Sequence, residues 1–265
     1  MDGRPIGFLD SGVGGLSLLA ATRRLLPHER YIALADGRYF PYGESDPDGI
    51  CERVERLSAF LLDGDVKLIV AACNTASVHA LAHLRASFPV IPFVGVVPVV
   101  KTLARRTRTG TIALLSTPAT AESPYLAELL REFAPGKRVL NIPCPGLAEA
   151  VEAGEVGAER TSSLLAPILE HVSAAGADVL GLGCTHYFFL RPAIKRILGS
   201  GVQVFDASRP VARRVRQVLL QRDALGSCPS GPDEFYTTGD AARFAVVAQT
   251  LLRRPIESVA AVDLD

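Results

Sequence analysis

The sequence predicts an α/β fold of two similar lobes, each with a mostly parallel sheet flanked by helices. Three observations lead to this fold class. Short apolar runs alternate with longer amphipathic segments along the 265 residues. The short runs are apolar throughout, which is typical of strands covered on both faces. Hydrophobic residues make up 48% of the chain and charged residues 21%, a composition that can bury a sizeable core and excludes disorder.

The expected strands fall into two sets. The first set lies at 6–9, 31–35, 67–72 and 91–96, and the second at 110–115, 138–142, 179–182 and 202–205. Amphipathic segments predict helices between and after these strands, at 16–26, 50–62, 77–87, 124–132, 159–175, 210–225 and 241–252. A stretch rich in Gly, Ser and Pro at 226–232 predicts a loop before the last helix.

The two sets of strands resemble copies of one another. The third strand of each set ends in a cysteine, Cys73 or Cys184, followed by polar residues. Val94 and Phe205, in the strands that come next, each lie 21 residues beyond their cysteine. We therefore expect a first lobe from residues 1–97 with 207–265 and a second from 98–206. Because ligands bind beyond the carboxyl ends of parallel strands, the two cysteines are expected on opposite sides of a shared active-site cleft.

Charge and cysteine usage narrow the class of protein. Basic and acidic residues both number 28, so the chain has no cationic excess for nucleic acid or acidic lipid. The longest apolar stretch, 88–100, is too short to span a bilayer and holds three prolines, and we see no signal peptide. Five cysteines at irregular spacing form no Cys-x-x-Cys pair, which favours neither disulfides nor a zinc ribbon. We expect a cytoplasmic protein with reduced thiols.

Two turns beyond strand ends are candidate ligand contacts. Residues 10–15, with the sequence DSGVGG, open a helix and could hold an anion, although Ser17 replaces the third glycine of a dinucleotide fingerprint and no Walker lysine follows. The alternative is that these glycines only shape a turn. Asp10, at the carboxyl end of its strand, is expected to face the cleft. Pro41, Tyr42 and Gly43 are either turn residues or a loop that contacts substrate.

The two cysteines carry the main chemical signal. A lone cysteine after a strand is commonly a small buried hydrophobic residue. Here, however, Asn74-Thr75 and Thr185-His186 follow the cysteines where helices are expected to begin. A helix N-terminus and a nearby histidine both lower the pKa of a thiol. We therefore interpret both cysteines as functional residues, and His186 as either an active-site residue or a core histidine. A zinc site made of both cysteines and His186 has poor spacing. We assign no chemistry to the remaining cysteines, Cys51, Cys144 and Cys228.

Together, these motifs resemble glutamate racemases, within the cofactor-independent aspartate/glutamate racemase superfamily. The resemblance rests on residues 6–16 (IGFLDSGVGGL), 41–43 (PYG), 72–77 (ACNTAS) and 183–187 (GCTHY), which occur in the family's order. Weaker matches lie at 151–154 (VEAG) and 235–240 (FYTTGD). Residues 116–120 (STPAT) fit the family's substrate-contacting loop, with Thr117 and Thr120 as candidate contacts.

The resemblance implies interconversion of L- and D-glutamate by two bases, supplying D-glutamate for peptidoglycan synthesis. It implies that Cys73 takes the α-proton from D-glutamate and Cys184 takes it from L-glutamate. In the family pattern Asp10 supports Cys73, whereas His186 and Glu152 support Cys184. The implied substrate contacts are Asp10, Ser11, Pro41, Tyr42, Gly43, Asn74, Thr75, Thr117, Thr120, Thr185 and His186. Members of the family often form homodimers.

Other activities make different demands on the sequence. Pyridoxal phosphate would need a Schiff-base lysine, and none of Lys67, Lys101, Lys137 and Lys195 is expected in the cleft, so we predict no cofactor and no metal. An aspartate racemase or another isomerase of the superfamily is the alternative among enzymes. A nucleotide- or anion-binding module built on the glycine turn is the alternative outside enzymes; it would bind ligand without exchanging substrate α-protons.

Overall fold

The computed structural model describes residues 2–227 and 231–265, which form two parallel sheets covered by helices. The predicted fold class is therefore confirmed. The chain divides into two units, which are described separately. Unit 1 consists of Met1–Val96 and Ser208–Asp265, and unit 2 of Val97–Ala207. Cys228 lies outside the described residues.

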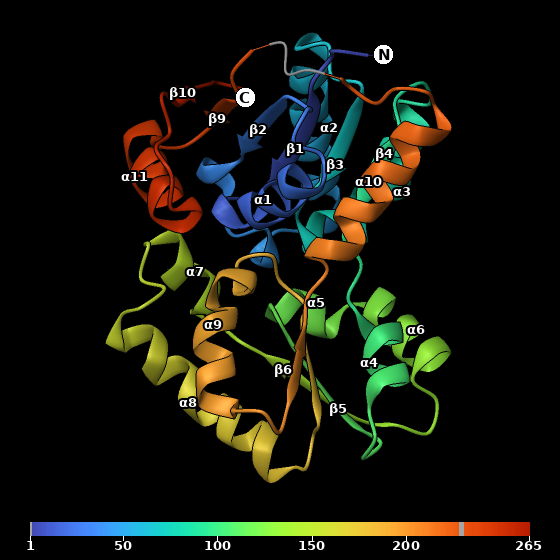
Figure 1. Cartoon of the computed structure of the whole chain (residues 1–265), viewed down its shortest axis with the longest axis vertical. Helices are drawn as coiled ribbons and strands as arrows, with labels where there is room; N and C mark the ends of the chain where they lie inside the picture. The colour runs from blue at the N-terminus through green and yellow to red at the C-terminus, as the bar shows by residue number, and fades with distance from the viewer. Residues whose placement is uncertain (1, 228–230) are drawn as a thin grey trace. The chain divides into compact units, whose positions relative to one another are not determined.

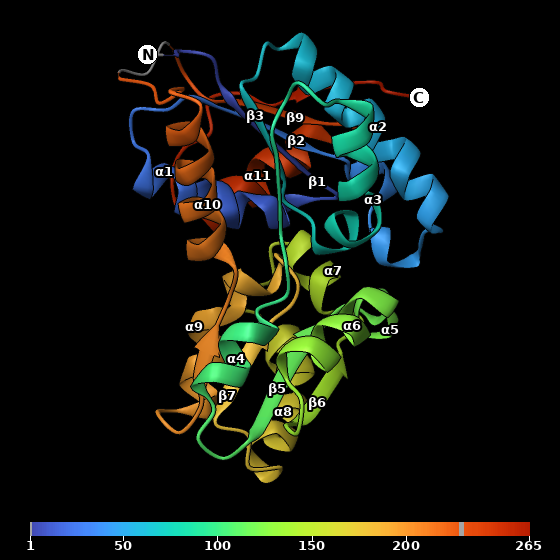
Figure 2. The same ribbon diagram turned by 90° about the vertical axis from the view of Figure 1, so that its right-hand side faces the viewer.

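Unit 1 is built on a six-stranded sheet with the order β10-β9-β2-β1-β3-β4, in which every pairing is parallel. Its strands are β1 (Ile6–Asp10), β2 (Tyr31–Ala35), β3 (Leu68–Ala71), β4 (Phe93–Gly95), β9 (Glu234–Thr237) and β10 (Ala260–Ala261). Its helices are α1 (Leu16–Leu25), α2 (Pro47–Asp63), α3 (Asn74–Ser87), α10 (Ser208–Gln221) and α11 (Ala241–Leu252), with short 3-10 turns η1 (Val13–Gly15), η2 (Gly37–Tyr39) and η3 (Tyr42–Glu44). Helices α2 and α3 cover one face of the sheet, and α1 and α10 cover the other (Figure 2).

The register of unit 1 brings its candidate residues to one edge of the sheet. Asp10 pairs with Ala35 of β2, and Leu9 pairs with Ala71 of β3. Asp36 and Cys73 therefore follow their strands on either side of Asp10. Because β1, β2 and β3 are buried along their whole length, the strands cannot slip without exposing apolar side chains, which fixes this edge.

Unit 2 has a four-stranded parallel sheet with the order β6-β5-β7-β8. Its strands are β5 (Thr111–Ser116), β6 (Arg138–Pro143), β7 (Val179–Leu182) and β8 (Gln203–Phe205). Its helices are α4 (Val100–Arg106), α5 (Pro118–Glu122), α6 (Pro124–Phe133), α7 (Leu147–Glu152), α8 (Glu159–Ala174) and α9 (Tyr187–Leu198). In Figure 1, α8 and α9 lie on one side of the strands and α4 and α6 on the other.

Several boundaries differ from the predicted ones for local reasons. Helix α2 begins at Pro47 because Asp46 accepts hydrogen bonds from the amides of Asp48 and Gly49, a cap that the apolar periodicity does not reveal. Helix α3 begins directly after Cys73, whereas α9 begins only at Tyr187, three residues beyond Cys184. Strand β10 was not predicted, since it has two exposed residues and no pattern of its own.

Among the described residues, no helix combines the length and the apolar character needed to cross a membrane.

Candidate active site

In unit 1, Asp10, Ser11 and Cys73 form a buried cluster at the carboxyl ends of β1 and β3. The Ser11 hydroxyl donates to Oδ1 of Asp10 over 3.2 Å and lies 3.7 Å from Sγ of Cys73. All three side chains are at most 6% exposed. Asn74 and Thr75, also buried, form the start of α3 immediately after the cysteine. The structure therefore brings together five of the predicted site residues.

The Ser11 hydroxyl connects the Asp10 carboxyl group to the Cys73 sulfur. It donates to Oδ1 of Asp10, and in its contact with Cys73 either the hydroxyl or the thiol can be the donor. Asp10 is therefore linked to Cys73 through Ser11.

Gly15 has a steric function in this cluster. A Cβ at this position would lie 2.9 Å from Cβ of Asp10 and 3.0 Å from its Oδ2. Such distances are too short for carbon, so any larger residue would push the Asp10 carboxylate away. Of the two interpretations of the glycine turn, this contact favours a structural one for Gly15, with a direct consequence for the site.

The turn at Pro41, Tyr42 and Gly43 lies against the same unit. Tyr42 is 2% exposed and belongs to the apolar cluster that contains Ile50, Val54 and Cys73. Its hydroxyl donates to Oδ2 of Asp36 over 2.6 Å. Burial and the neighbouring Asp36 carboxylate raise the pKa of Tyr42 well above its ordinary value, so the phenol stays neutral and remains a donor. Pro41 and Gly43 are half-buried.

In unit 2, Cys184, His186 and Glu152 form a chain of contacts. Nδ1 of His186 lies 3.6 Å from Sγ of Cys184, and Nε2 lies 2.7 Å from Oε1 of Glu152. Cys184 follows β7, and Glu152 is the last residue of α7. His186 is 2% exposed, and Thr185 beside it is 1% exposed. The structure thus brings the three predicted catalytic residues of this unit together.

The surroundings of His186 favour its charged ring. Burial opposes the charged ring, but hydrogen bonds with Cys184 and Glu152 outweigh that effect and raise the pKa of His186 well above its ordinary value. In a protonated ring both nitrogens are donors, one to Glu152 and one to the sulfur. A charged His186 therefore offers a hydrogen bond to Cys184.

The loop after β5 places its two threonines side by side. Thr117 caps α5: its hydroxyl accepts from the amide of Thr120 and donates to the Thr120 hydroxyl over 3.0 Å. Thr120 is 1% exposed, whereas Thr117 is half-buried. Of the two hydroxyls, Thr117 is therefore the more accessible to a ligand.

The other cysteines and the most buried lysine have structural surroundings. Burial raises the pKa of Cys144 to about 12, so this thiol is not a base near neutral pH. Burial also raises the pKa of Cys51.

Nζ of Lys67 is fully buried, 2.6 Å from Oε2 of Glu29, and donates to the Asp2 carbonyl. Lys67 precedes β3 and Cys73 follows it, so the two residues lie at opposite ends of the same strand. In residues 2–227 and 231–265, no three His, Cys, Asp or Glu side chains are grouped to hold a metal ion.

Sequence reasoning missed Asp36, which is fully buried at the edge of the unit 1 sheet. Its carboxylate accepts from Tyr42, from Arg53 and from Thr238. An acidic residue directly after a predicted strand was the available signal.

Comparisons with known proteins show the family to which the chain belongs. The Asp/Glu/Hydantoin racemase family matches residues 16–215. A glutamate racemase from Pseudomonas entomophila is 44% identical over 236 residues, which cover 89% of each chain. The crystal structure of glutamate racemase from Francisella tularensis in complex with D-glutamate has a TM-score of 0.85 and 29% identity, covering 100% of this chain and 99% of that one. The Escherichia coli glutamate racemase in complex with L-glutamate and the activator UDP-MurNAc-ala has a TM-score of 0.87 and 31% identity, covering 98% of each chain.

The chain belongs to the Asp/Glu/hydantoin racemase family. The resemblance found in its motifs is thereby confirmed, and the protein is an isomerase.

Proposed function

We propose that this isomerase interconverts L- and D-glutamate, with Cys73 and Cys184 as its two acid/base groups. The curated relatives that support this substrate carry the name glutamate racemase at 41–44% identity. Solved structures of relatives hold D-glutamate in one case and L-glutamate in another. The single observation that carries the proposal is that each unit has a buried cysteine just beyond a parallel strand, in contact with Ser11 in unit 1 and with His186 in unit 2.

Racemisation requires a proton to leave one face of the α-carbon and another to arrive at the opposite face. We propose that Cys184 takes the proton from L-glutamate while Cys73 donates one, and that the roles reverse for D-glutamate. A thiolate is a base whose conjugate acid can return a proton near neutral pH. One thiol must be ionised while the other is protonated, and the different partners of the two cysteines, Ser11 beside Cys73 and His186 beside Cys184, support this assignment.

His186 and Glu152 are proposed to assist Cys184, and Asp10 to assist Cys73. The imidazolium donates to the sulfur in its ionised form and releases that interaction when the sulfur is protonated. Glu152 holds the ring through Nε2, which fixes its orientation and favours its charged form. Asp10 acts on Cys73 through the Ser11 hydroxyl.

Substrate binding is proposed to rest on neutral donors. Side chains of Ser11, Asn74, Thr75 and Thr185, with the backbone of Tyr42 and Gly43, offer hydroxyl, amide and N–H groups for the carboxylates and the ammonium. Contacts from Asp10, Pro41, Thr117, Thr120 and His186 complete the proposed set. Neutral donors bind either enantiomer without a fixed charge pattern, which a racemase needs because its substrate and product differ only in handedness.

The cellular setting follows from the resemblance to the family. We propose that the enzyme acts in the cytoplasm as a homodimer and supplies D-glutamate for peptidoglycan. Four cysteines, Cys51, Cys73, Cys144 and Cys184, are free thiols in the described residues, which supports a reducing compartment.

The proposal is tested with purified protein, without added cofactor, and chiral separation of the products. L-glutamate should become a mixture of both enantiomers, and L-aspartate should remain unchanged under the same conditions. Conversion of aspartate alone would assign the chain to the neighbouring activity of the superfamily. Ligand binding without any inversion would contradict a racemase function altogether.

A further inference from the structure

The Asp36 carboxylate connects three segments of unit 1. Oδ2 of Asp36 accepts from the Tyr42 hydroxyl over 2.6 Å and from Nε of Arg53 over 3.1 Å. Oδ1 accepts from Nη2 of Arg53 over 2.9 Å and from the Thr238 hydroxyl over 2.7 Å. Each carboxylate oxygen thus accepts two hydrogen bonds, and the donors come from η3, from α2 and from the residue after β9.

The backbone of Asp36 is also hydrogen-bonded to the sheet edge that carries Asp10. The amide of Asp36 donates to the backbone carbonyl of Asp10 over 2.8 Å. The amide of Thr238 donates to the carbonyl of Ala35 over 3.0 Å. The position of the carboxylate is therefore set by the same strands that position the candidate site, and not by a flexible loop.

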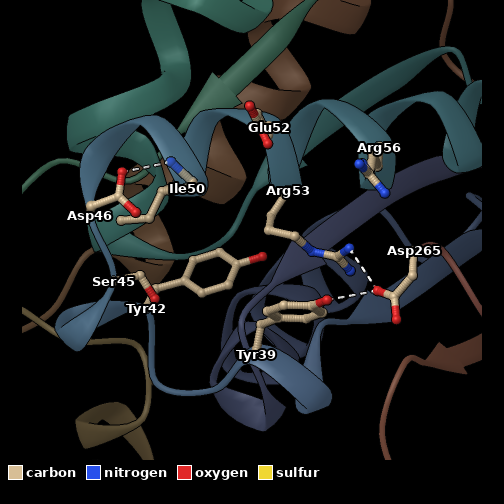
Figure 3. A pocket seen from close by; sticks show the side chains of 10 residues that line it. Tyr39, Tyr42, Ser45, Asp46, Ile50, Glu52, Arg53, Arg56 and Asp265 are labelled. Atoms are coloured by element: carbon tan, nitrogen blue, oxygen red, sulfur yellow. Dashed lines mark hydrogen bonds and ion pairs between the residues drawn. The ribbon is translucent and has the colours of Figure 1, made fainter.

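Arg53 supports the carboxylate from the opposite side. Its guanidinium forms a forked pair with Asp36 and lies 3.9 Å from the centre of the Tyr39 ring (Figure 3). Its remaining Nη1 donates to the Leu264 carbonyl over 3.0 Å and contacts Asp265 at 3.3 Å. Tyr39 and Arg53 line a hollow of about 520 Å³ at the surface. A planar guanidinium held by five contacts has little freedom, so it provides a rigid support for a buried charge.

Tyr42 lies between this network and the candidate site. Its ring belongs to the apolar cluster that includes Cys73, and its hydroxyl is the donor to Asp36. Tyr42 is also the first residue of η3, so a fixed ring fixes the backbone of the turn. Fixing the hydroxyl therefore restrains the N–H groups of Tyr42 and Gly43, which are among the proposed substrate donors.

We propose that Asp36, held by Arg53, is a positioning residue that fixes the 41–43 turn for substrate binding through the Tyr42 hydroxyl. The inference rests on the proposed function, because it concerns how the same turn binds glutamate. Asp36 and Arg53 do not touch substrate in this account. They keep donors in place that bind the substrate and the transition state alike. Loss of the Tyr42–Asp36 hydrogen bond should therefore weaken binding and leave the proton-transfer steps almost unchanged.

The test compares two tyrosine-to-phenylalanine variants. Tyr42→Phe removes the hydroxyl that meets Asp36. Tyr31→Phe is the matched control: Tyr31 is also fully buried, its hydroxyl donates to the Leu26 carbonyl over 2.8 Å, and it lies at the other end of β2. KM and kcat are measured for L- and D-glutamate in both variants and in the wild type, together with thermal melting. KM does not depend on the fraction of folded enzyme, so it separates positioning from a loss of stability.

We expect Tyr42→Phe to raise KM in both directions by about three- to tenfold, the size of one lost hydrogen bond, with kcat within about twofold of wild type. Tyr31→Phe should lower the melting temperature and leave KM unchanged. Asp36→Asn should also raise KM, because it removes the charge that orients Arg53. An unchanged KM in Tyr42→Phe, or an equal rise in Tyr31→Phe, would overturn the positioning role. A wild-type protein that does not racemise glutamate would overturn the proposed function as well, so the two failures are distinguishable.

Discussion

The two units place the same chemical group, a cysteine thiol, at the same position after a parallel strand, but surround it differently. In unit 1 the Ser11 hydroxyl connects Cys73 to the Asp10 carboxyl group. In unit 2 a histidine held by Glu152 points its nitrogen at Cys184. The neighbour of the sulfur is thus a neutral hydroxyl in unit 1 and a basic ring in unit 2. The difference shows that two similar lobes can give the same thiol different acid/base surroundings.

Loss of either sulfur should have the largest effect. Cys73→Ser and Cys184→Ser should each reduce racemisation by about 10³- to 10⁴-fold, because a serine hydroxyl is far too weak an acid to replace the thiol. Cys144→Ser is the control, since Cys144 is a buried thiol in the same unit as Cys184 without a proposed role. The rates are followed by circular dichroism of glutamate. If either variant kept wild-type turnover, two-base chemistry would be wrong.

The partner of Cys184 should matter next, and its effect should depend on pH. Glu152 raises the pKa of His186, so Glu152→Gln should lower it. In the proposed mechanism, turnover of L-glutamate should fall as pH rises through the His186 pKa, because the neutral ring no longer offers its proton to the Cys184 sulfur. In Glu152→Gln this decline should begin at lower pH, with kcat reduced by about 10- to 100-fold.

Glu155→Gln provides the comparison for that profile, since Glu155 pairs with the exposed Arg160. It should leave the pH dependence as in the wild type. An unaltered profile in Glu152→Gln would show that the carboxylate does not control the ring.

The partner of Cys73 can be disturbed without changing any polar group. Gly15→Ala places a methyl group 2.9 Å from Cβ of Asp10 and should shift the carboxylate. We expect kcat/KM to fall by about 10- to 100-fold, the usual cost of a displaced acid/base group. Gly157→Ala is the control, because nothing lies within 4 Å of the added carbon. Equal activity of the two variants would mean that the position of Asp10 is unimportant.

Lys67, at the opposite end of β3 from Cys73, should affect the stability of the protein and not its activity. Lys67→Met leaves the buried Glu29 carboxylate without its cation, with the Gly226 amide as a remaining donor, and breaking a buried ion pair in this way typically costs about 3–5 kcal/mol of unfolding free energy. Turnover per folded molecule should change by less than about twofold, because Lys67 lies far along the strand from Cys73. Denaturant unfolding and kinetics on the same sample separate the two quantities. A loss of activity with stability retained would give Lys67 a chemical role.

The strands that hold both cysteines could be predicted from sequence because parallel strands buried on both faces are uniformly apolar. The interval of 21 residues from each cysteine to the next strand revealed the repeat of the lobes. Strands β2 and β7 agree with the predicted ranges to the residue, since each is bounded by polar or glycine residues.

The residues that contact the cysteines and support the site were harder to predict from the sequence. His186 is two residues from Cys184, whereas Glu152 lies 34 residues before His186 and was found through family resemblance alone. Asp36 and Arg53 are 17 residues apart, the first directly after strand β2 and the second on helix α2. Contacts of this kind depend on how elements pack, and they leave no periodic signal in the chain. For the glycines at 10–15 the sequence left an anion site and a turn as alternatives, because the steric contact of Gly15 with Asp10 becomes visible only in three dimensions.

The most direct test of two thiols in opposite protonation states is the first turnover of L-glutamate in heavy water. One base gives up its own deuteron to the product while the other keeps the proton taken from substrate. Proton transfer by two separate cysteines therefore predicts that newly formed D-glutamate carries deuterium at the α-carbon while the remaining L-glutamate carries none. Mass spectrometry of the separated enantiomers at early times measures both pools. Product that retains the original proton would contradict the account, because it would mean that a single group serves both faces.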